Sequence, residues 1–315
     1  MAQTSPSIKV LQPNQGESLW ALGEKLTFKL GTEDTGGEFG FAELVAQPGG
    51  GPPPHIHRRE DEMFYVLDGD FTFVVGDRTF TRSPGFAAYL HRNVLHTYNN
   101  VGTRPGRMLT AVAPCGFEQF IREWSHPVRD PMEPPPQPLQ QDIDKLIATA
   151  PEYGIELHPE FKAIPDASVP PTDRAYWVLG QLVTFKLVSP DTAGHFSVVE
   201  VSSFPGEGVL PHLHLAMEEL FYILDEAFEF TFGSRVERVE PGGLVFVPRG
   251  TLHSFRNVGR DVARLFDVHS PGGFEAFFEE AGTPARDPHR PPRQSPDMDW
   301  LLTLFQKHGM EMPLP

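Results

Sequence analysis

The sequence PHIHRREDE at residues 54–62 returns in altered form as PHLHLAMEE at residues 211–219. In both stretches one residue separates two histidines, and a glutamate follows the second histidine at the fifth position. A His-x-His pair in a β-strand places both imidazoles on one face, because successive side chains alternate. We expect the intervening turn to return the chain along a neighbouring strand that begins with the glutamate.

A third histidine completes the pattern in each half. It lies 34 residues after the glutamate, in the strand-like contexts LHTYNN at residues 95–100 and LHSFRN at residues 252–257. Three neutral imidazoles and one carboxylate suit a divalent transition metal such as Fe, Mn, Co, Ni, Cu or Zn. Four protein ligands leave open positions on a five- or six-coordinate ion, which favours catalysis over a structural role. The predicted ligands, for one metal per half, are His55, His57, Glu62 and His96, and His212, His214, Glu219 and His253.

The two stretches belong to an internal duplication of the chain. An offset of 157 residues joins Trp20 to Trp177 and continues without a gap to Asp130 and Asp287. The offset then slips by two residues. A repeat of this kind predicts two domains with the same architecture, and we place them at residues 1–157 and 158–315. Pro-rich tracts at residues 127–138 and 284–296 are expected to be extended connectors before a short C-terminal helix in each half.

Short runs rich in aromatic and β-branched residues fill each half. Examples are residues 63–67, 71–75 and 78–81, which are interrupted by the turn signals DGD and GD. Such spacing predicts an all-β fold, an antiparallel sandwich or barrel, with a few short helices. One helix is expected where Phe117, Phe120, Ile121 and Trp124 recur at helical spacing, and that stripe should pack against the barrel.

The composition excludes several classes of partner. The 315-residue chain carries a formal net charge of −16, which argues against binding to nucleic acid or to an anionic membrane surface. Its single cysteine excludes an intrachain disulfide and Cys-based metal sites. No apolar run approaches 20 residues and no secretory signal is visible, so we expect a cytoplasmic protein without a membrane span.

With both histidine patterns in place, the chain resembles the cupin superfamily. The first cupin motif, G-x5-H-x-H-x3-4-E-x6-G, is met by Gly49 or Gly50 with the first His-x-His and glutamate, followed by Gly69. The second half meets the second motif, G-x5-P-x-G-x2-H-x3-N, with Gly242, Pro248, Gly250, His253 and Asn257. The resemblance implies a bicupin, that is, two tandem cupin domains that are jelly-roll β-barrels.

Two departures from the motifs concern turns. In the first half, His91 and Asn93 replace Pro and Gly. Asparagine tolerates the left-handed conformation that glycine supplies, so this turn should survive, with His91 as a surface residue. In the second half, Glu226 replaces the motif glycine, and we expect a different hairpin turn there.

Within the superfamily, the chain looks like quercetin 2,3-dioxygenase-like proteins, on the stretches WALG at 20–23, DTGG at 34–37 and GGGPPPHIH at 49–57. This resemblance implies oxidative ring cleavage of a flavonol or a related aromatic or enediol substrate with O2, with Glu62 and Glu219 as both ligand and base. Three alternatives stay open: an oxalate decarboxylase- or oxidase-like bicupin, a metal-dependent isomerase and a non-enzymatic metal-binding bicupin. The oxalate alternative requires an inward arginine, and Arg58, Arg59 and Arg92 are not clearly aimed inward.

Strand alternation extends the predicted site beyond the metal ligands. If the ligands point inward, so do four aromatic residues, which we predict to bind substrate: Phe64, Tyr98, Phe221 and Phe255. An apolar, partly aromatic cavity suits a flat aromatic substrate, although the same rings could fill the core of the barrel. The resemblance to quercetin 2,3-dioxygenase-like proteins implies a small-molecule substrate and O2 as partners, and we expect the chain to be a monomer or a homodimer.

Overall fold

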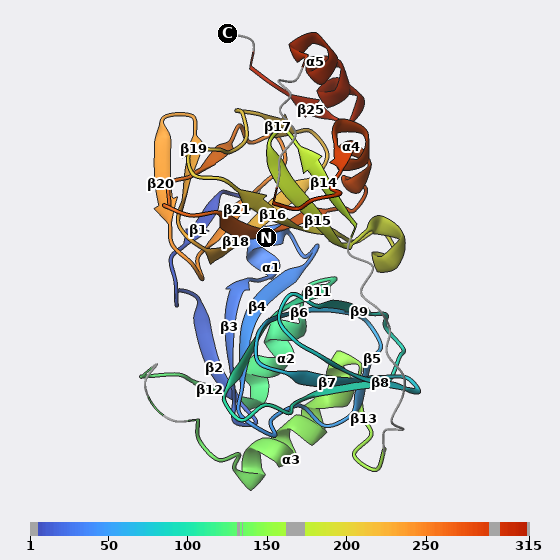
Figure 1. Cartoon of the computed structure of the whole chain (residues 1–315). Coiled ribbons are helices and arrows are strands. Elements are labelled where there is room, and N and C mark those ends of the chain that lie inside the picture. The colour runs from blue at the N-terminus through green and yellow to red at the C-terminus, as the bar shows by residue number, and fades with distance from the viewer. Residues whose placement is uncertain (1–5, 131–132, 134, 162–173, 290–296, 314–315) are drawn as a thin grey trace. The chain divides into compact units, whose positions relative to one another are not determined.

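The computed structural model describes residues 6–130, 133, 135–161, 174–289 and 297–313. The chain divides into two compact units, one of residues 1–6 and 16–171 and the other of residues 7–15 and 172–315. Both units consist mainly of antiparallel strands with a few short helices (Figure 1), which confirms the all-β prediction.

The first unit contains two sheets. One has the order β12-β2-β3-β4-β11-β6-β9 and the other the order β13-β5-β10-β7-β8. The strands of the first sheet are β12 (His126–Pro127), β2 (Glu17–Ala21), β3 (Glu24–Leu30), β4 (Gly40–Ala46), β11 (Gly106–Ala113), β6 (Asp61–Asp68) and β9 (Ala87–Leu90). Those of the second are β13 (Ile155–Leu157), β5 (His55–His57), β10 (His96–Asn100), β7 (Phe71–Val75) and β8 (Arg78–Arg82).

The strand that follows the His-x-His turn lies in the other sheet. β5 pairs with β10 and β13, whereas β6 pairs with β11 and β9. The expectation that β6 would run beside β5 is therefore wrong. The turn signal shows where the chain reverses but not whether it crosses between sheets, as it does here. The consequence is that histidines from one sheet face a glutamate from the other.

The second unit repeats this arrangement. Its large sheet has the order β1-β21-β18-β23-β16-β15-β14-β24, and smaller sheets have the orders β20-β19-β22 and β17-β25. The strands of the large sheet are β1 (Lys9–Leu11), β21 (Leu244–Val247), β18 (Glu218–Asp225), β23 (Ala263–Ser270), β16 (Ser197–Ser203), β15 (Gln181–Leu187), β14 (Ala175–Val178) and β24 (Thr283–Pro284). The smaller sheets contain β20 (Arg235–Val239), β19 (Phe228–Phe232), β22 (Ser254–Asn257), β17 (Leu213–His214) and β25 (Met310–Glu311). β1 precedes the repeat and pairs with β21.

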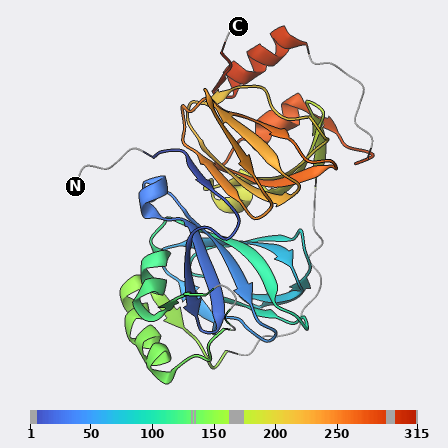
Figure 2. The ribbon, with the colours of Figure 1, turned by 90° about the vertical axis from the view of Figure 1, so that its left-hand side faces the viewer.

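Short helices flank the sheets. They are α1 (Thr32–Thr35), α2 (Phe117–Trp124), α3 (Gln140–Thr149), η1 (Ala150–Tyr153), η2 (Ser189–Thr192), α4 (Glu275–Ala281) and α5 (Met298–Lys307). In the first unit α2 and α3, drawn in green, lie side by side on one face of the barrel (Figure 2). Phe120, Ile121 and Trp124 of α2 are buried against the barrel, as their spacing predicts. Among the described residues, no helix is long and apolar enough to cross a membrane.

Two turns test the predictions about backbone conformation. Asn93 has φ 68°, close to the 76° of Gly250 at the matching position, so asparagine keeps the turn as expected. Glu226 has φ 55° where Gly69 has 88°, so both hairpins use a left-handed residue, and the prediction of a different turn is wrong. The Glu226 carboxylate accepts a hydrogen bond from the backbone N–H of Arg260 at 3.1 Å, a contact that helps to hold this conformation.

Candidate metal centres

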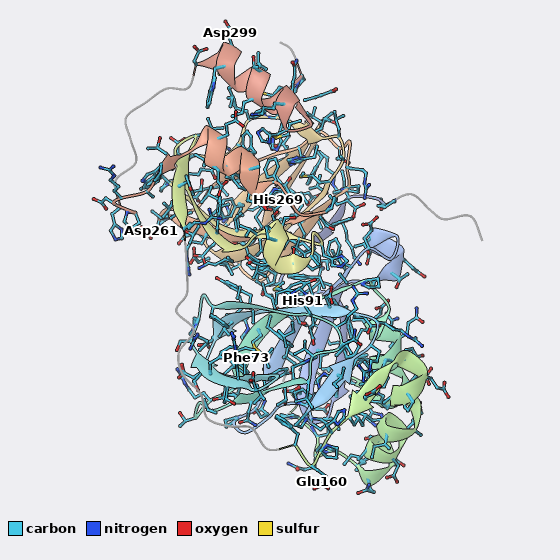
Figure 3. All side chains as sticks on the ribbon, turned by 90° about the vertical axis from the view of Figure 1, so that its right-hand side faces the viewer. Phe73, His91, Glu160, Asp261, His269 and Asp299 are labelled. Carbon is cyan, nitrogen blue, oxygen red and sulfur yellow. The ribbon has the colours of Figure 1, made fainter. Side chains whose placement is uncertain are left out.

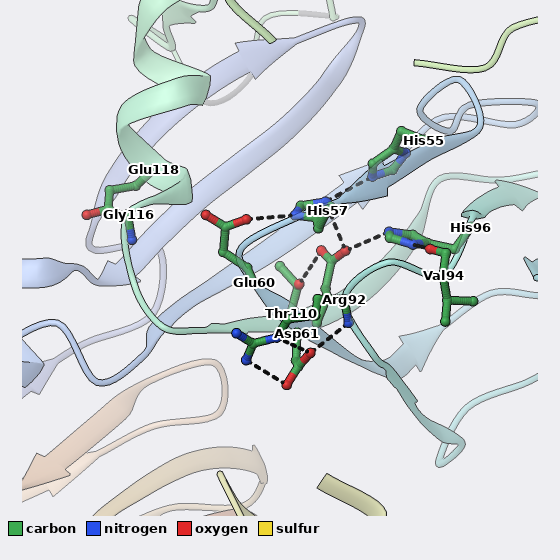
Figure 4. A network of polar contacts seen from close by, with 11 residues as sticks. His55, His57, Glu60, Asp61, Arg92, Val94, His96, Thr110, Gly116 and Glu118 are labelled. Atoms are coloured by element: carbon green, nitrogen blue, oxygen red, sulfur yellow. Dashed lines mark hydrogen bonds and ion pairs between the residues drawn. The ribbon is translucent and has the colours of Figure 1, made fainter. Parts of the chain in front are cut away.

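The first predicted ligand set converges between the two sheets of the first unit. Its four residues are buried, and their ligand atoms all lie within 4.8 Å of one another. His57 Nε2 lies 3.1 Å from His55 Nε2 and 3.6 Å from Glu62 Oε2. Glu62 Oε2 also lies 3.2 Å from His96 Nε2. The three imidazoles face a common centre in Figure 4.

The outer ring nitrogens fix two of these imidazoles. His55 Nδ1 donates to the carbonyl oxygen of Pro53, and His96 Nδ1 donates to that of Val94, each at 2.9 Å. A carbonyl only accepts, so both rings carry their proton on Nδ1 and present the Nε2 lone pair to the centre. Burial, together with the neighbouring imidazoles of His96 and His57, holds the pKa of His55 well below its usual value. His55 is therefore neutral near pH 7 and can offer its Nε2 lone pair to a metal.

The surroundings of Glu62 favour its charged form, which is the form that binds a metal. Burial by itself would raise the pKa of Glu62, but His96, His57 and the Thr110 hydroxyl together lower it below the usual value. Thr110 Oγ1, on the adjacent β11, donates to Glu62 Oε1 at 3.1 Å. That hydrogen bond leaves Oε2 directed at the histidines.

The donor set fits a divalent metal. A buried carboxylate and imidazole lone pairs crowded within hydrogen-bond distance are costly without a shared cation. His57 Nδ1 has no hydrogen bond among the described residues, but it lies 3.5 Å from the carboxylate of Glu60, at the outer side of the cluster. Carboxylates in this outer position are typical partners of metal-binding histidines.

The second ligand set has the same geometry in the second unit. Its four buried residues again place their ligand atoms within 4.8 Å of one another. Glu219 Oε2 lies 2.8 Å from His253 Nε2 and 3.1 Å from His214 Nε2. His212 Nδ1 donates a hydrogen bond to the carbonyl oxygen of Leu210 at 2.8 Å. Burial is the main cause that lowers the pKa of His212 to about 3. Both units therefore offer three imidazoles and one carboxylate.

The environment of Glu219 contains two residues that the sequence reasoning missed. His269 Nε2 lies 3.2 Å from Glu219 Oε1 and 3.8 Å from Asp267 Oδ2. His269, labelled in Figure 3, is fully buried in the second unit, and its ring stacks on that of Phe274 with the ring centroids 4.3 Å apart. Burial foremost, opposed by the neighbouring His269 and reinforced by the charge of Glu219, raises the pKa of Asp267 well above its usual value. In the repeat these positions correspond to Thr110 and Val112. The sequence therefore shows an Asp and a His in β23 where the first half has Thr and Val, and this difference could have pointed to them.

We expect the substitution His269→Val to weaken metal binding at the second centre by about tenfold or more, because a residue that contacts a ligand orients it. Chelator competition would measure the dissociation constant. The double substitution Asp267→Thr with His269→Val recreates the residues of the first unit and should recover most of the loss. An unchanged affinity in the His269→Val variant would show that His269 does not position Glu219.

Each ligand set opens into an apolar cavity. The first cavity has a volume of about 100 Å³ and reaches His55 and Glu62. The second has a volume of about 60 Å³ and reaches His212 and Glu219. Among the described residues, neither wall contains an arginine or a lysine.

Three of the four aromatic residues predicted to bind substrate lie in these walls. Phe64 and Tyr98 line the first cavity, and Phe255 lines the second. Phe221 is instead packed in the core, with ring centroids 5.2 Å from Phe230 and 5.4 Å from Phe255. Phe221 is buried in the core of the barrel, as an inward direction predicts, but it is not among the residues that line the second cavity.

The arginines that were considered for an oxalate-type site lie elsewhere. Arg58 pairs with Glu156 at 2.6 Å, and Arg92 pairs with Asp61 at 3.0 Å. Arg59 donates to the backbone carbonyl of Glu152. His91 is exposed, as expected for a turn residue.

Comparisons with known proteins find one family twice in the chain. The family described as Cupin domain matches residues 42–112 and 200–269, once in each unit. The chain is 24% identical over 294 residues to quercetin 2,3-dioxygenase of Bacillus subtilis, covering 87% of this chain and 86% of that protein.

Two solved structures show the same fold. One is oxalate decarboxylase of Lactobacillus farciminis, with a TM-score of 0.60, 16% identity and coverage of 87% of this chain and 88% of that one. The other is procruciferin, an 11S globulin of Brassica napus, with a TM-score of 0.57, 12% identity and coverage of 85% of both chains. At these identities the likeness extends to the fold alone.

Proposed function

Because the chain carries two cupin domains and resembles quercetin 2,3-dioxygenases, we propose that it is a metal-dependent dioxygenase. Its substrate would be a flavonol-like or related aromatic or enediol compound, whose ring it opens. The observation that carries this proposal is that each buried ligand set opens into an apolar cavity. A wall of this kind favours a flat apolar body, and the ligand set holds its polar end.

The residues of the chain supply two parts of the reaction, and the metal that they would hold supplies a third. The apolar walls bind the ring system and exclude water, as the aromatic side chains of Phe64 and Phe255 do. Glu62 and Glu219 would accept the proton of the substrate hydroxyl, since a carboxylate at the cavity base lies within reach of a bound ligand. A divalent metal, when bound by the four side chains, would polarise the substrate oxygen and lower the barrier to reaction with O2.

The alternative of an oxalate-converting enzyme lacks support in the cavity walls. A small dianion requires a positive partner, and the described walls contain acidic, aromatic and aliphatic side chains but no arginine or lysine. A sugar isomerase needs several polar contacts to its substrate, whereas most of the side chains in these walls are apolar.

We expect the metal-loaded chain to consume O2 with quercetin and to release carbon monoxide, with no turnover of oxalate. An oxygen electrode and gas analysis would measure both, after separate loading with Fe, Mn, Co, Ni, Cu and Zn. Turnover of oxalate instead of quercetin would favour the decarboxylase or oxidase alternative. Absence of O2 consumption with every metal would contradict the proposed reaction.

A further inference from the structure

A buried acid and a phenol meet in the wall of the first cavity, away from the metal ligands. Glu24, the first residue of β3, is only 5% exposed. Its Oε2 accepts a hydrogen bond from the Tyr98 hydroxyl at 2.9 Å, whereas its Oε1 is buried and has no hydrogen-bond partner among the described residues. Both side chains line the cavity.

A carboxyl oxygen that is buried in an apolar wall without a hydrogen-bond partner is energetically costly. Burial foremost, opposed by the hydrogen bond from Tyr98, raises the pKa of Glu24 to about 8. The carboxyl group is therefore mostly protonated near pH 7. Since Tyr98 donates to Oε2, the acid proton resides on Oε1, which is buried in the wall beside the cavity and becomes accessible to a ligand when the carboxyl group rotates.

The second unit shows that the fold does not require the hydrogen-bonded pair of Glu24 and Tyr98. At the matching positions stand Gln181 and Phe255, so the tyrosine hydroxyl and the acid are both absent. Gln181 Nε2 donates to the backbone carbonyl of Gly208 at 3.3 Å, although its Oε1 also lacks a partner in the described part of the chain. The barrel closes around these residues with the same strand pairing, β15 beside β16 where the first unit has β3 beside β4. A purely structural role for Glu24 and Tyr98 is therefore unnecessary.

We propose that Glu24 and Tyr98 form a subsite that selects a hydroxyl group on an aromatic ligand of the first cavity, and that the second cavity lacks this selection. A hydroxyl both donates and accepts, so it satisfies Glu24 Oε1 whether that oxygen carries the proton or not. The cavity of about 100 Å³ is smaller than a cavity of about 150 Å³ that holds benzene, so an aromatic ligand would also occupy its open end. This inference deepens the proposed function and rests on it for the class of ligand, but the recognition itself requires no turnover.

Binding of phenol and of toluene to the full chain tests the subsite, because the two probes have nearly the same shape and differ in the hydroxyl. Ligand-detected NMR or calorimetry would give both dissociation constants. We expect the wild-type chain to bind phenol about tenfold more tightly than toluene, as one additional hydrogen bond to a buried group would give. The double substitution Glu24→Met with Tyr98→Phe should remove that preference, chiefly by weakening the binding of phenol.

Two further variants serve as controls. Glu24→Gln keeps a donor beside Tyr98 and should retain part of the preference, whereas Gln181→Met in the second cavity should leave it intact. The double variant introduces at position 98 the phenylalanine that the second unit already has, and circular dichroism would verify its fold. If Glu24→Met alone disturbed folding, Tyr98→Phe alone should still lower the preference.

Equal binding of phenol and toluene to the wild-type chain would overturn the inference, as would binding of neither probe. A preference that survives in the double variant would also overturn it. A preference for phenol that depends on Glu24, found in a chain that consumes no O2 with quercetin, would support the subsite and contradict the proposed reaction. The two proposals therefore fail separately.

Discussion

Replacing Glu62 with glutamine is expected to lower turnover at the first centre by about 100-fold or more, the usual contribution of a general base. Glutamine keeps the size of the side chain and the hydrogen bond from Thr110, but its amide is a poor proton acceptor and a neutral metal ligand. The rate of O2 consumption, measured in a His212→Ala background that disables the second centre, would report this site alone.

The matched variant Glu219→Gln, measured in a His55→Ala background, tests the second centre in the same way. The control is Thr110→Val, which removes the donor to Glu62 and should reduce turnover far less. A Glu62→Gln variant that kept most of its turnover would show that this glutamate is not the base.

His55→Ala is expected to remove the metal from the first centre and leave the second loaded, and His212→Ala should do the reverse. Loss of a ligand should weaken binding by more than about 100-fold, since loss of even an outer partner costs about 10–100-fold. Elemental analysis of each purified variant would show about one metal per chain, and the double variant should hold none.

His91→Ala is the matched control for these variants. It removes an exposed histidine from the same unit and should leave the metal content unchanged. Loss of both metals in either single variant would mean that the two centres are not independent.

The sequence predicted the fold, and the grouping of three histidines with one glutamate in each half, because both depend on short, repeated patterns. Two copies of His-x-His followed by glutamate, and a third histidine in each half, recur at one offset, and the structure brings each set together. Alternation along β10 likewise predicted that Tyr98 faces inward with His96.

Other features depend on contacts between distant strands, which a local pattern does not report. Glu24 begins a strand and resembles an ordinary exposed residue until Tyr98, 74 positions later, is placed against it. The pairing of β1 with β21 lies outside the repeat, and the left-handed Glu226 departs from the usual preference for glycine. Asp267 and His269 were visible as differences between the halves, but their meaning depended on Glu219 lying on the neighbouring strand β18.

The two centres share their ligands and differ in their surroundings. In the first unit Thr110 contacts the ligand glutamate and Glu24 faces the cavity, whereas in the second His269 and Asp267 flank the glutamate and Gln181 stands in place of Glu24. The duplicated barrels therefore present different polar groups around one common donor set. Different substrate preferences, or different rates, are the expected result.

The most direct test of the account is a crystal structure of the metal-loaded chain with anomalous diffraction data at the absorption edge of the metal. The account predicts one anomalous peak among His55, His57, Glu62 and His96 and another among His212, His214, Glu219 and His253. Absence of a peak from both sets in crystals grown with saturating metal would contradict it.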